Sequence, residues 1–200
     1  MIQYPSIPGW KYVSLGRPCY AFYKYDGSNL RFEWSPKKGW HKFGTRTQLF
    51  NSDTDLYNQS LPFFFNNISD VLVSKVCKML GYKPERIVAF AEFYGDSSFA
   101  GTHLIDEAKI LKLFDVSIYK QGFLDARTYL KLFDAFEHSA ELVYTGNMSK
   151  SFVEQVKGGI LSLNEGVVCK GNDWAAKIKT EAYLTKLKNY VGPSWKDEGE

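Results

Sequence analysis

Lys24-Tyr25-Asp26-Gly27-Ser28-Asn29 is the segment of this chain that says most about its structure and chemistry. It follows the apolar run 20–23, and Asp26-Gly27-Ser28 has the composition of a turn. A lysine at the end of an apolar strand is partly removed from water, and this favours the neutral, nucleophilic amine. We therefore interpret Lys24 as a candidate nucleophile. A surface lysine at a hairpin turn is the alternative when Lys24 is taken alone.

Short apolar strands account for much of the rest of the chain. Alternating or continuous apolar runs predict strands over residues 19–24, 29–34, 40–45, 87–94, 110–119, 165–170 and 174–179. The turns at 26–28 and 36–39 predict that the first three strands form a meander, and 171–173 supplies the turn of the last pair.

Helices are expected between these strands. Capping residues and apolar spacing predict helices over 69–80 up to Gly81, from Asp125 through Phe136, from Ser149 or Ser151 to 158–159, and from Thr180 onward. The polar segment 51–67 is expected to be loop with a short helix. Hairpins flanked by a few helices indicate an α+β fold of antiparallel sheets. We expect one domain over 1–191 and a polar tail over 192–200.

Composition narrows the class of protein. The chain has 200 residues, 44% of them hydrophobic, and its net charge of +3 is compatible with a polyanionic partner. The three cysteines are widely spaced and include no CxxC, and the three histidines are also far apart. Neither a disulfide framework nor a zinc site is therefore expected. A signal peptide and a membrane span are not expected either, so the expected location is the cytoplasm, or a host cytoplasm for a phage protein.

Three later segments add acidic and basic groups to Lys24. Glu92 interrupts an apolar strand, Glu165 begins another, and Lys177 and Lys179 alternate with Ile178. Two lysines separated by one residue lie on one face of a strand, where they can neutralise a developing phosphate charge. Each feature alone has a structural explanation, such as a buried ion pair or a solvated strand face.

Together these segments resemble the covalent nucleotidyltransferase superfamily of polynucleotide ligases and mRNA capping enzymes. Lys24-Tyr25-Asp26-Gly27 resembles its motif I, and Gly44-Thr45-Arg46 lies where the RNA-ligase branch carries its motif Ia arginine. The other matches are Glu92 in motif III, Phe114 in motif IIIa, 165–168 in motif IV and 177–179 in motif V. The resemblance implies a nucleotidyltransferase, or ligase adenylation, fold similar to the ATP-grasp arrangement.

The resemblance also implies roles for these residues. Lys24 would attack the α-phosphate of ATP and carry AMP covalently, with Lys177 and Lys179 contacting that phosphate. Asn29 and Glu92 would contact the ribose, and Arg46 would contact the ribose or the 5′-phosphate strand. Phe114 would stack on adenine. Mg²⁺ or Mn²⁺ would be held by Glu165 and Asp26 together with phosphate oxygens. Several relatives carry an acidic residue immediately before the nucleophile, where it helps to recognise the adenine amine. This chain has Tyr23 there and so departs from the family pattern at the position expected to select the base.

The implied activity is ATP-dependent RNA ligation of the phage type, as in RNA repair. Its substrate would be RNA with 5′-phosphate and 3′-OH ends, single-stranded, nicked or in a stem-loop. Only residues 180–200 follow motif V, too few for the OB-fold domain of DNA ligases and capping enzymes, so no such domain is expected. The alternatives are a minimal ATP-dependent DNA ligase and a non-catalytic nucleic-acid-binding module with this fold.

Overall fold

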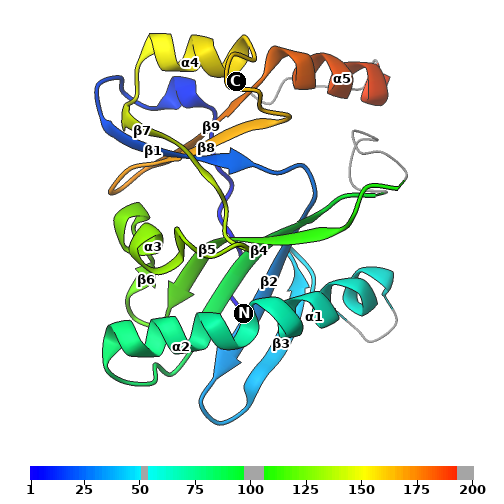
Figure 1. Ribbon diagram of the computed structural model, residues 1–200, viewed down its shortest axis with the longest axis vertical. Coiled ribbons are helices and arrows are strands. Elements are labelled where there is room, and N and C mark those ends of the chain that lie inside the picture. The colour runs from blue at the N-terminus through cyan, green and yellow to red at the C-terminus, as the bar shows by residue number, and fades with distance from the viewer. Residues whose placement is uncertain (51–53, 97–105, 193–200) are drawn as a thin grey trace. The chain divides into compact units, whose positions relative to one another are not determined.

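The computed structural model describes residues 1–50, 54–96 and 106–192. The chain divides into two compact units (Figure 1). Unit 1 comprises Met1–Tyr4, Gly27–Gly95 and Ala108–Ser139, and unit 2 comprises Pro5–Asp26, Asp96–Glu107 and Ala140–Glu200. Among the described residues, each unit contains one antiparallel sheet with helices against it.

Unit 1 is built on a five-stranded sheet in the order β3-β2-β4-β5-β6. Its strands are β2 (Ser28–Ser35), β3 (Gly39–Thr45), β4 (Ile87–Tyr94), β5 (Ile110–Ile118) and β6 (Gly122–Phe123). The central strand β4 is almost wholly buried, which explains its nearly continuous apolar sequence.

Both faces of this sheet are covered by aromatic packing. Phe32 stacks on Phe64 of helix α1 (Asp55–Asn67) with ring centroids 3.9 Å apart, and α2 (Ser69–Leu80) follows α1 directly. Phe32 pairs with Ala89 of β4, and side chains alternate along a strand, so Phe90 lies on the opposite face of the sheet. There its ring packs against Tyr4, with ring centroids 5.1 Å apart. Helix α3 (Ala126–Phe133) is tied to β5 by Tyr129, whose hydroxyl donates to the Leu113 carbonyl at 2.5 Å.

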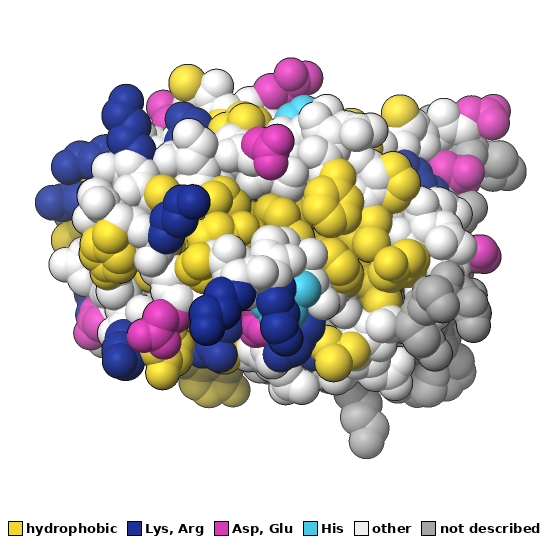
Figure 2. Space-filling model, turned by 90° about the horizontal axis from the view of Figure 1, so that it is seen from below, with side chains coloured by type: hydrophobic (Ala, Val, Ile, Leu, Met, Phe, Trp, Pro, Cys, Tyr) yellow, Lys and Arg dark blue, Asp and Glu magenta, His cyan; other side chains and the backbone are white. Residues whose placement is uncertain are grey.

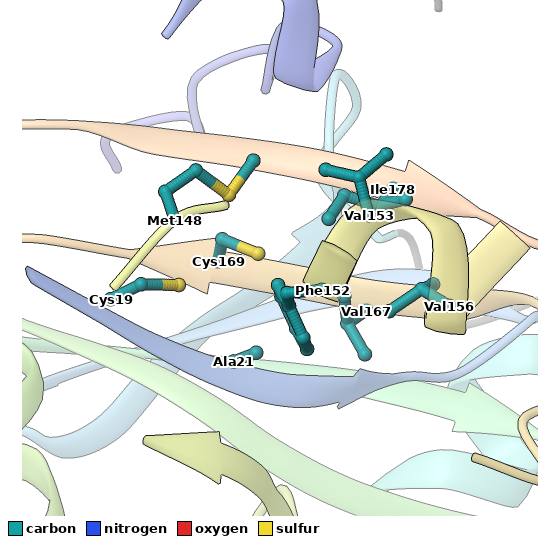
Figure 3. Packing of buried hydrophobic residues seen from close by; sticks show 9 residues of the cluster. All are labelled: Cys19, Ala21, Met148, Phe152, Val153, Val156, Val167, Cys169 and Ile178. Carbon is teal, nitrogen blue, oxygen red and sulfur yellow. The ribbon is translucent and has the colours of Figure 1, made fainter. Parts of the chain in front are cut away.

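Unit 2 is built on a four-stranded sheet in the order β7-β1-β8-β9. Its elements are the 3-10 turn η1 (Trp10–Tyr12), β1 (Pro18–Lys24), β7 (Leu142–Asn147), α4 (Lys150–Lys157), β8 (Gly166–Lys170), β9 (Ala175–Lys179) and α5 (Glu181–Val191). Figure 3 shows α4 packed over one face of the sheet. The side chains of this core are Cys19, Ala21, Met148, Phe152, Val153, Val156, Val167, Cys169 and Ile178.

The caps read from the sequence are largely confirmed. Asp125, Ser149 and Thr180 each accept hydrogen bonds from backbone N–H groups of α3, α4 and α5. Gly81 closes α2 in the left-handed conformation. The 165–170 and 174–179 pair forms the expected hairpin β8–β9. Cys19, Cys77 and Cys169 are free thiols, as expected.

The predicted meander is wrong in its first strand. β1 pairs with β7 and β8, whereas β2 pairs with β3 and β4, so residues 25–27 connect two sheets and do not close a hairpin. The polar residues that favour a tight turn also suit a chain that leaves one sheet for another. A Cβ on Gly27 would lie 2.4 Å from the Phe93 carbonyl oxygen, so the glycine permits close backbone approach there.

The prediction for 51–67 is wrong in extent over its described part, since the expected short helix is the 13-residue α1, which includes Pro62. A proline inside a helix costs about 3 kcal/mol. Burial of Leu61 and Phe64 supplies about 1.5–3 kcal/mol each, which offsets that cost.

Other elements differ from prediction. α3 ends at Phe133, before the predicted Phe136, and strands β6 and β7 were not predicted. The helix predicted over 69–80 is found with those bounds as α2. Residues 51–53 of the predicted loop and 193–200 of the predicted tail lie outside the described residues, and the single-domain boundary at 191 stays a prediction. No helix among the described residues is long and apolar enough to cross a membrane.

Candidate active site

Lys24, Gly166 and Lys179 form a row across the sheet of unit 2. Lys24 of β1 is the register partner of Gly166 of β8, which is the partner of Lys179 of β9. Residues directly opposite one another point to the same face of a sheet, so both amines lie on one side. Strands are about 4.8 Å apart, so β1 and β9 are separated by about 10 Å, with a glycine that has no side chain between them.

Glu165 joins the two lysines. Its Oε1 lies 2.6 Å from Nζ of Lys24 and 4.0 Å from Nζ of Lys179. The Glu165 side chain is 4% exposed, against 24% for Lys24 and 17% for Lys179. Burial raises the pKa of Glu165, and the positive charges of Lys24 and Lys179 oppose that shift. The carboxylate is therefore more basic than an exposed glutamate and touches the amine predicted to be the nucleophile.

Gly166 is required by the backbone that places Glu165. Its φ is 147°, and a Cβ there would lie 2.0 Å from the carbonyl oxygen of Ile178. Any other residue would push β9 away from β8. The glycine that follows Glu165 in the motif therefore keeps the two strands in close contact.

The predicted lysine pair on β9 shares one face. Lys177 and Lys179 are half-buried and alternate with the buried residues Ala176 and Ile178. The backbone N–H of Lys177 donates to the Pro8 carbonyl at 2.9 Å, so the segment before η1 holds the edge of β9. This arrangement confirms that the spacing of two residues places both amines on the same face.

Asp26 is buried and held by α5. The Tyr183 hydroxyl donates to Oδ1 of Asp26 at 2.9 Å, and Thr180 caps the same helix by accepting from the Tyr183 N–H at 3.1 Å. Nζ of Lys179 lies 5.5 Å from the centre of the Tyr183 ring. Tyr183 thus links α5 both to Asp26 and to the lysine row, a role that the sequence analysis did not assign.

Tyr23 supports the loop that carries Glu165. Its hydroxyl accepts a hydrogen bond from the Asn164 N–H at 3.2 Å, and its ring lies 4.8 Å from that of Tyr25. The Tyr25 hydroxyl accepts from the Glu141 N–H at 3.3 Å. Burial raises the pKa of Tyr23, and it raises that of Tyr25 to about 12. Both hydroxyls stay protonated at neutral pH, and the predicted contact of Tyr23 with a nucleotide stays a prediction.

In unit 1, Asn29 and Glu92 are brought together. They are register partners on β2 and β4, and Lys112 of β5 continues the row beyond Glu92. The Oδ1 atom of Asn29 is buried without a hydrogen-bond partner. A buried polar atom without a hydrogen-bond partner lowers stability by about 1–3 kcal/mol. A ligand hydroxyl that donated a hydrogen bond to this oxygen would recover part of that energy.

Arg46 and Phe114 also lie in unit 1. Arg46 is exposed just after β3, in a loop held by pairing of Gly44 with Leu49. Phe114 is half-buried and meets Tyr4 edge-on, with ring centroids 4.9 Å apart. Their predicted contacts with nucleotide stay predictions.

The residues predicted to hold a divalent metal have suitable chemistry. Oε2 of Glu165 is buried with no hydrogen-bond partner, and Asp26 is close enough for its charge to affect the pKa of Glu165. The described residues contain no group of three or more His, Cys, Asp or Glu that could form a metal cage. Two carboxylates completed by phosphate oxygens are an ordinary arrangement for Mg²⁺.

The architecture matches solved RNA ligase structures. A Naegleria gruberi RNA ligase variant superimposes with a TM-score of 0.67 at 16% identity, over 94% of this chain and 58% of that one. A variant of that ligase with ATP and manganese gives 0.67 at 15% identity, over 94% and 59%. The ligase with pyrophosphate gives 0.60 at 19% identity, over 87% and 52%. The chain therefore shares its fold with these RNA ligase structures.

At these identities the likeness concerns the fold. The chain spans between 52% and 59% of the length of the three solved structures quoted above. No protein-family model matches it, and neither does any curated protein.

Proposed function

We propose that this chain is an ATP-dependent RNA ligase that forms a covalent lysyl-AMP on Lys24. The observation that carries the proposal is the 2.6 Å contact between Nζ of Lys24 and the buried Oε1 of Glu165. The fold shared with a ligase studied with ATP and manganese supports it.

In the first step, the neutral amine of Lys24 attacks the α-phosphorus of ATP. A P–N bond forms, the bond to the bridging oxygen breaks, and the electron pair leaves on pyrophosphate. The proton must leave Nζ, and Glu165 is placed to accept it because burial makes this carboxylate more basic.

Charge neutralisation is the second requirement of phosphoryl transfer. Lys177 and Lys179 present two amines on the Lys24 face of the sheet, which suits the non-bridging oxygens of the α-phosphate. Glu165 and Asp26 are the carboxylates that would hold Mg²⁺ or Mn²⁺, which supplies further positive charge against the phosphates when bound.

The later steps use RNA. AMP passes from Lys24 to the oxygen of a 5′-phosphate end, and a 3′-OH then attacks that phosphate and releases AMP. We assign ribose recognition to Asn29 and Glu92, on the strength of their shared row and the unsatisfied Asn29 Oδ1. Arg46 is assigned to ribose or the 5′-phosphate strand, and Phe114 to adenine.

Intact mass after incubation with ATP and Mg²⁺ tests the first step. We expect a gain of one AMP that is absent in Lys24→Met and retained in the control Lys150→Met, whose side chain is exposed at the start of α4. Parallel GTP samples test base choice. Folded protein that gains no mass with either nucleotide contradicts the proposal and favours the binding-module alternative.

Nick sealing separates RNA from DNA ligation. We expect faster sealing with RNA than with DNA on the 3′-OH side of a nicked duplex, and single-stranded RNA should be tested beside it. Faster sealing of all-DNA nicks would instead support a minimal DNA ligase.

The finer assignment is to phage-type RNA repair in the cytoplasm. It rests on the sequence 24–29 together with Gly44-Thr45-Arg46. Whether a partner protein assists RNA binding is a separate question that nick sealing by the isolated chain addresses.

A further inference from the structure

One end of the five-stranded sheet in unit 1 carries a concentration of positive charge. The β2–β3 turn, the start of β4 and the β5–β6 turn meet there, because Trp34 pairs with Ile87 and Ile87 pairs with Ile118. Asn29 and Glu92 are at the other end of the same strands. The basic end consists of Lys37, Lys38, Lys83, Arg86 and Lys120.

Tyrosine rings lie among these cations. The guanidinium carbon of Arg86 lies 4.9 Å from the centre of the Tyr119 ring, and Nζ of Lys120 lies 5.3 Å from it. The Tyr119 N–H donates to the Arg86 carbonyl at 3.0 Å, which fixes the ring beside the start of β4. Tyr119 is 38% exposed and Tyr82 is 56% exposed. The Tyr82 hydroxyl accepts a hydrogen bond from Gln121 at 3.1 Å.

Carboxylates offset little of this charge. Within the described part of the chain, none of the five cations lies within 4.0 Å of a carboxylate oxygen. Glu85 is exposed and precedes Arg86 in the sequence. Glu33 is buried and paired with Lys42 at 3.1 Å, and it is near enough to Arg86 for that charge to lower its pKa. Figure 2, which views the molecule from below, shows Lys and Arg side chains on the left and lower parts of this face beside hydrophobic ones, with a few Asp and Glu side chains among them.

The cations are spread over a width that suits a polymer. Neighbouring strands are about 4.8 Å apart, so the β2–β3 and β5–β6 turns place their lysines about 10–15 Å from one another. Exposed aromatic rings between cations suit stacking of bases in a single strand. A duplex or a membrane surface offers phosphates but no unstacked base for Tyr119 or Tyr82.

We propose that the basic end binds the backbone of single-stranded RNA, with bases against Tyr119 and Tyr82. The choice of RNA as the polyanion rests on the proposed function. Ile87 and Glu92 are separated by about 17 Å along β4, at about 3.4 Å per residue. Binding at the basic end is therefore independent of ATP and of a 5′-phosphate, and it adds grip on RNA away from the reacting ends.

Fluorescence anisotropy with a labelled single-stranded RNA of about 16 nucleotides, without a 5′-phosphate, tests this surface. The test variant is Lys37→Gln with Lys83→Gln and Lys120→Gln. The matched control removes three exposed lysines elsewhere, by Lys11→Gln, Lys131→Gln and Lys150→Gln.

The expected loss follows from counterion release. Each phosphate contact contributes about 0.7 to the slope of log K against log salt for a single strand. Loss of three contacts in the test variant should lower the magnitude of this slope by about 2 and the affinity for RNA by up to about 100-fold at 0.1 M salt. The affinity of the control variant should change little. Tyr119→Ala should weaken binding roughly fivefold or more, and Tyr12→Ala, at a ring 73% exposed in unit 2, should not.

Formation of the AMP adduct is measured on every variant, to separate this inference from the proposed function. Weakened RNA binding with unchanged adduct supports the basic end. Weakened RNA binding when no protein forms an adduct keeps the basic end and overturns the ligase proposal. Equal binding by test and control variants overturns the basic end. Binding to anionic lipid vesicles is measured on the same variants. If the test variant loses binding to the vesicles but keeps its binding to RNA, the RNA proposal is overturned and a membrane surface is indicated.

Discussion

Replacing Gly166 by alanine should be one of the most damaging single-methyl changes in unit 2. The added Cβ would lie 2.0 Å from the Ile178 carbonyl oxygen, and real Cβ contacts are essentially never below 3.0 Å, so β9 must move by about 1 Å. That movement weakens the backbone hydrogen bonds around Gly166, each worth about 1 kcal/mol. A non-glycine residue at φ 147° adds about 1–3 kcal/mol of strain. We expect a total loss of about 3–5 kcal/mol in the free energy of unfolding.

Gly159→Ala is the matched control. Gly159 also has a positive φ, 73°, but an added Cβ would meet nothing within 4 Å. Only the left-handed backbone is then penalised, at about 1–2 kcal/mol. The two variants should differ by about 2–3 kcal/mol, or about 4–12 °C in Tm for a chain of this size.

Urea and thermal unfolding followed by circular dichroism measure the difference, and adduct formation with ATP is measured on the same samples. Gly166→Ala should also lose the adduct under conditions where it is folded, because Glu165 moves with the strand. Stabilities of the two variants within about 0.5 kcal/mol of each other would refute the steric argument.

Three further predictions concern single side chains. Asp125→Ala should cost about 1 kcal/mol in urea unfolding, because Asp125 caps α3, whereas Thr54→Ala at the start of α1 should cost less since Thr54 makes no side-chain cap bond; equal losses would contradict this. Tyr25 has a folded pKa of about 12 against 10.0, so its contribution to stability is lost as pH rises through about 10–12, and Tyr25→Phe should lose less stability there. Burial raises the pKa of Glu165 in the folded state. Its contribution to the free energy of unfolding is therefore fully present below the pKa of the unfolded state and is lost as pH rises through the pKa of the folded state. Glu165→Gln should remove that loss between acid and neutral pH, and an unchanged pH profile of unfolding would show that Glu165 is not penalised by burial.

The parts of the fold that could be predicted from the sequence are those set by local chemistry. The period of two in Lys177-Ile178-Lys179 and the apolar run of β4 correspond to the strands found. Asp125 and Thr180 were identified as caps because a cap is a contact between near neighbours. The class of fold followed from these elements, and comparison with solved RNA ligases confirms it.

The errors arose where distant residues decide the outcome. The turn residues at 26–28 are compatible with a hairpin, and only the pairing of β1 with β7 and β8 excludes it. Pro62 argues against a helix locally, whereas stacking of Phe64 on Phe32 favours one. Tyr183 could be placed on the inner face of its helix by spacing, but its bond to Asp26 joins residues 157 apart, and no local pattern signals it.

The central position of β1 has a consequence for biosynthesis. Lys24 is made early, yet its strand partners in β7 and β8 begin at Leu142 and Gly166, and its counter-ion is Glu165. Long sequence separation slows folding, because a long loop must close before its contacts can form. At about 5–20 residues per second, a ribosome adds the intervening segment over many seconds. The Lys24 amine therefore lacks its counter-ion through most of synthesis, and its ion pair with Glu165 can form only after that residue has been made.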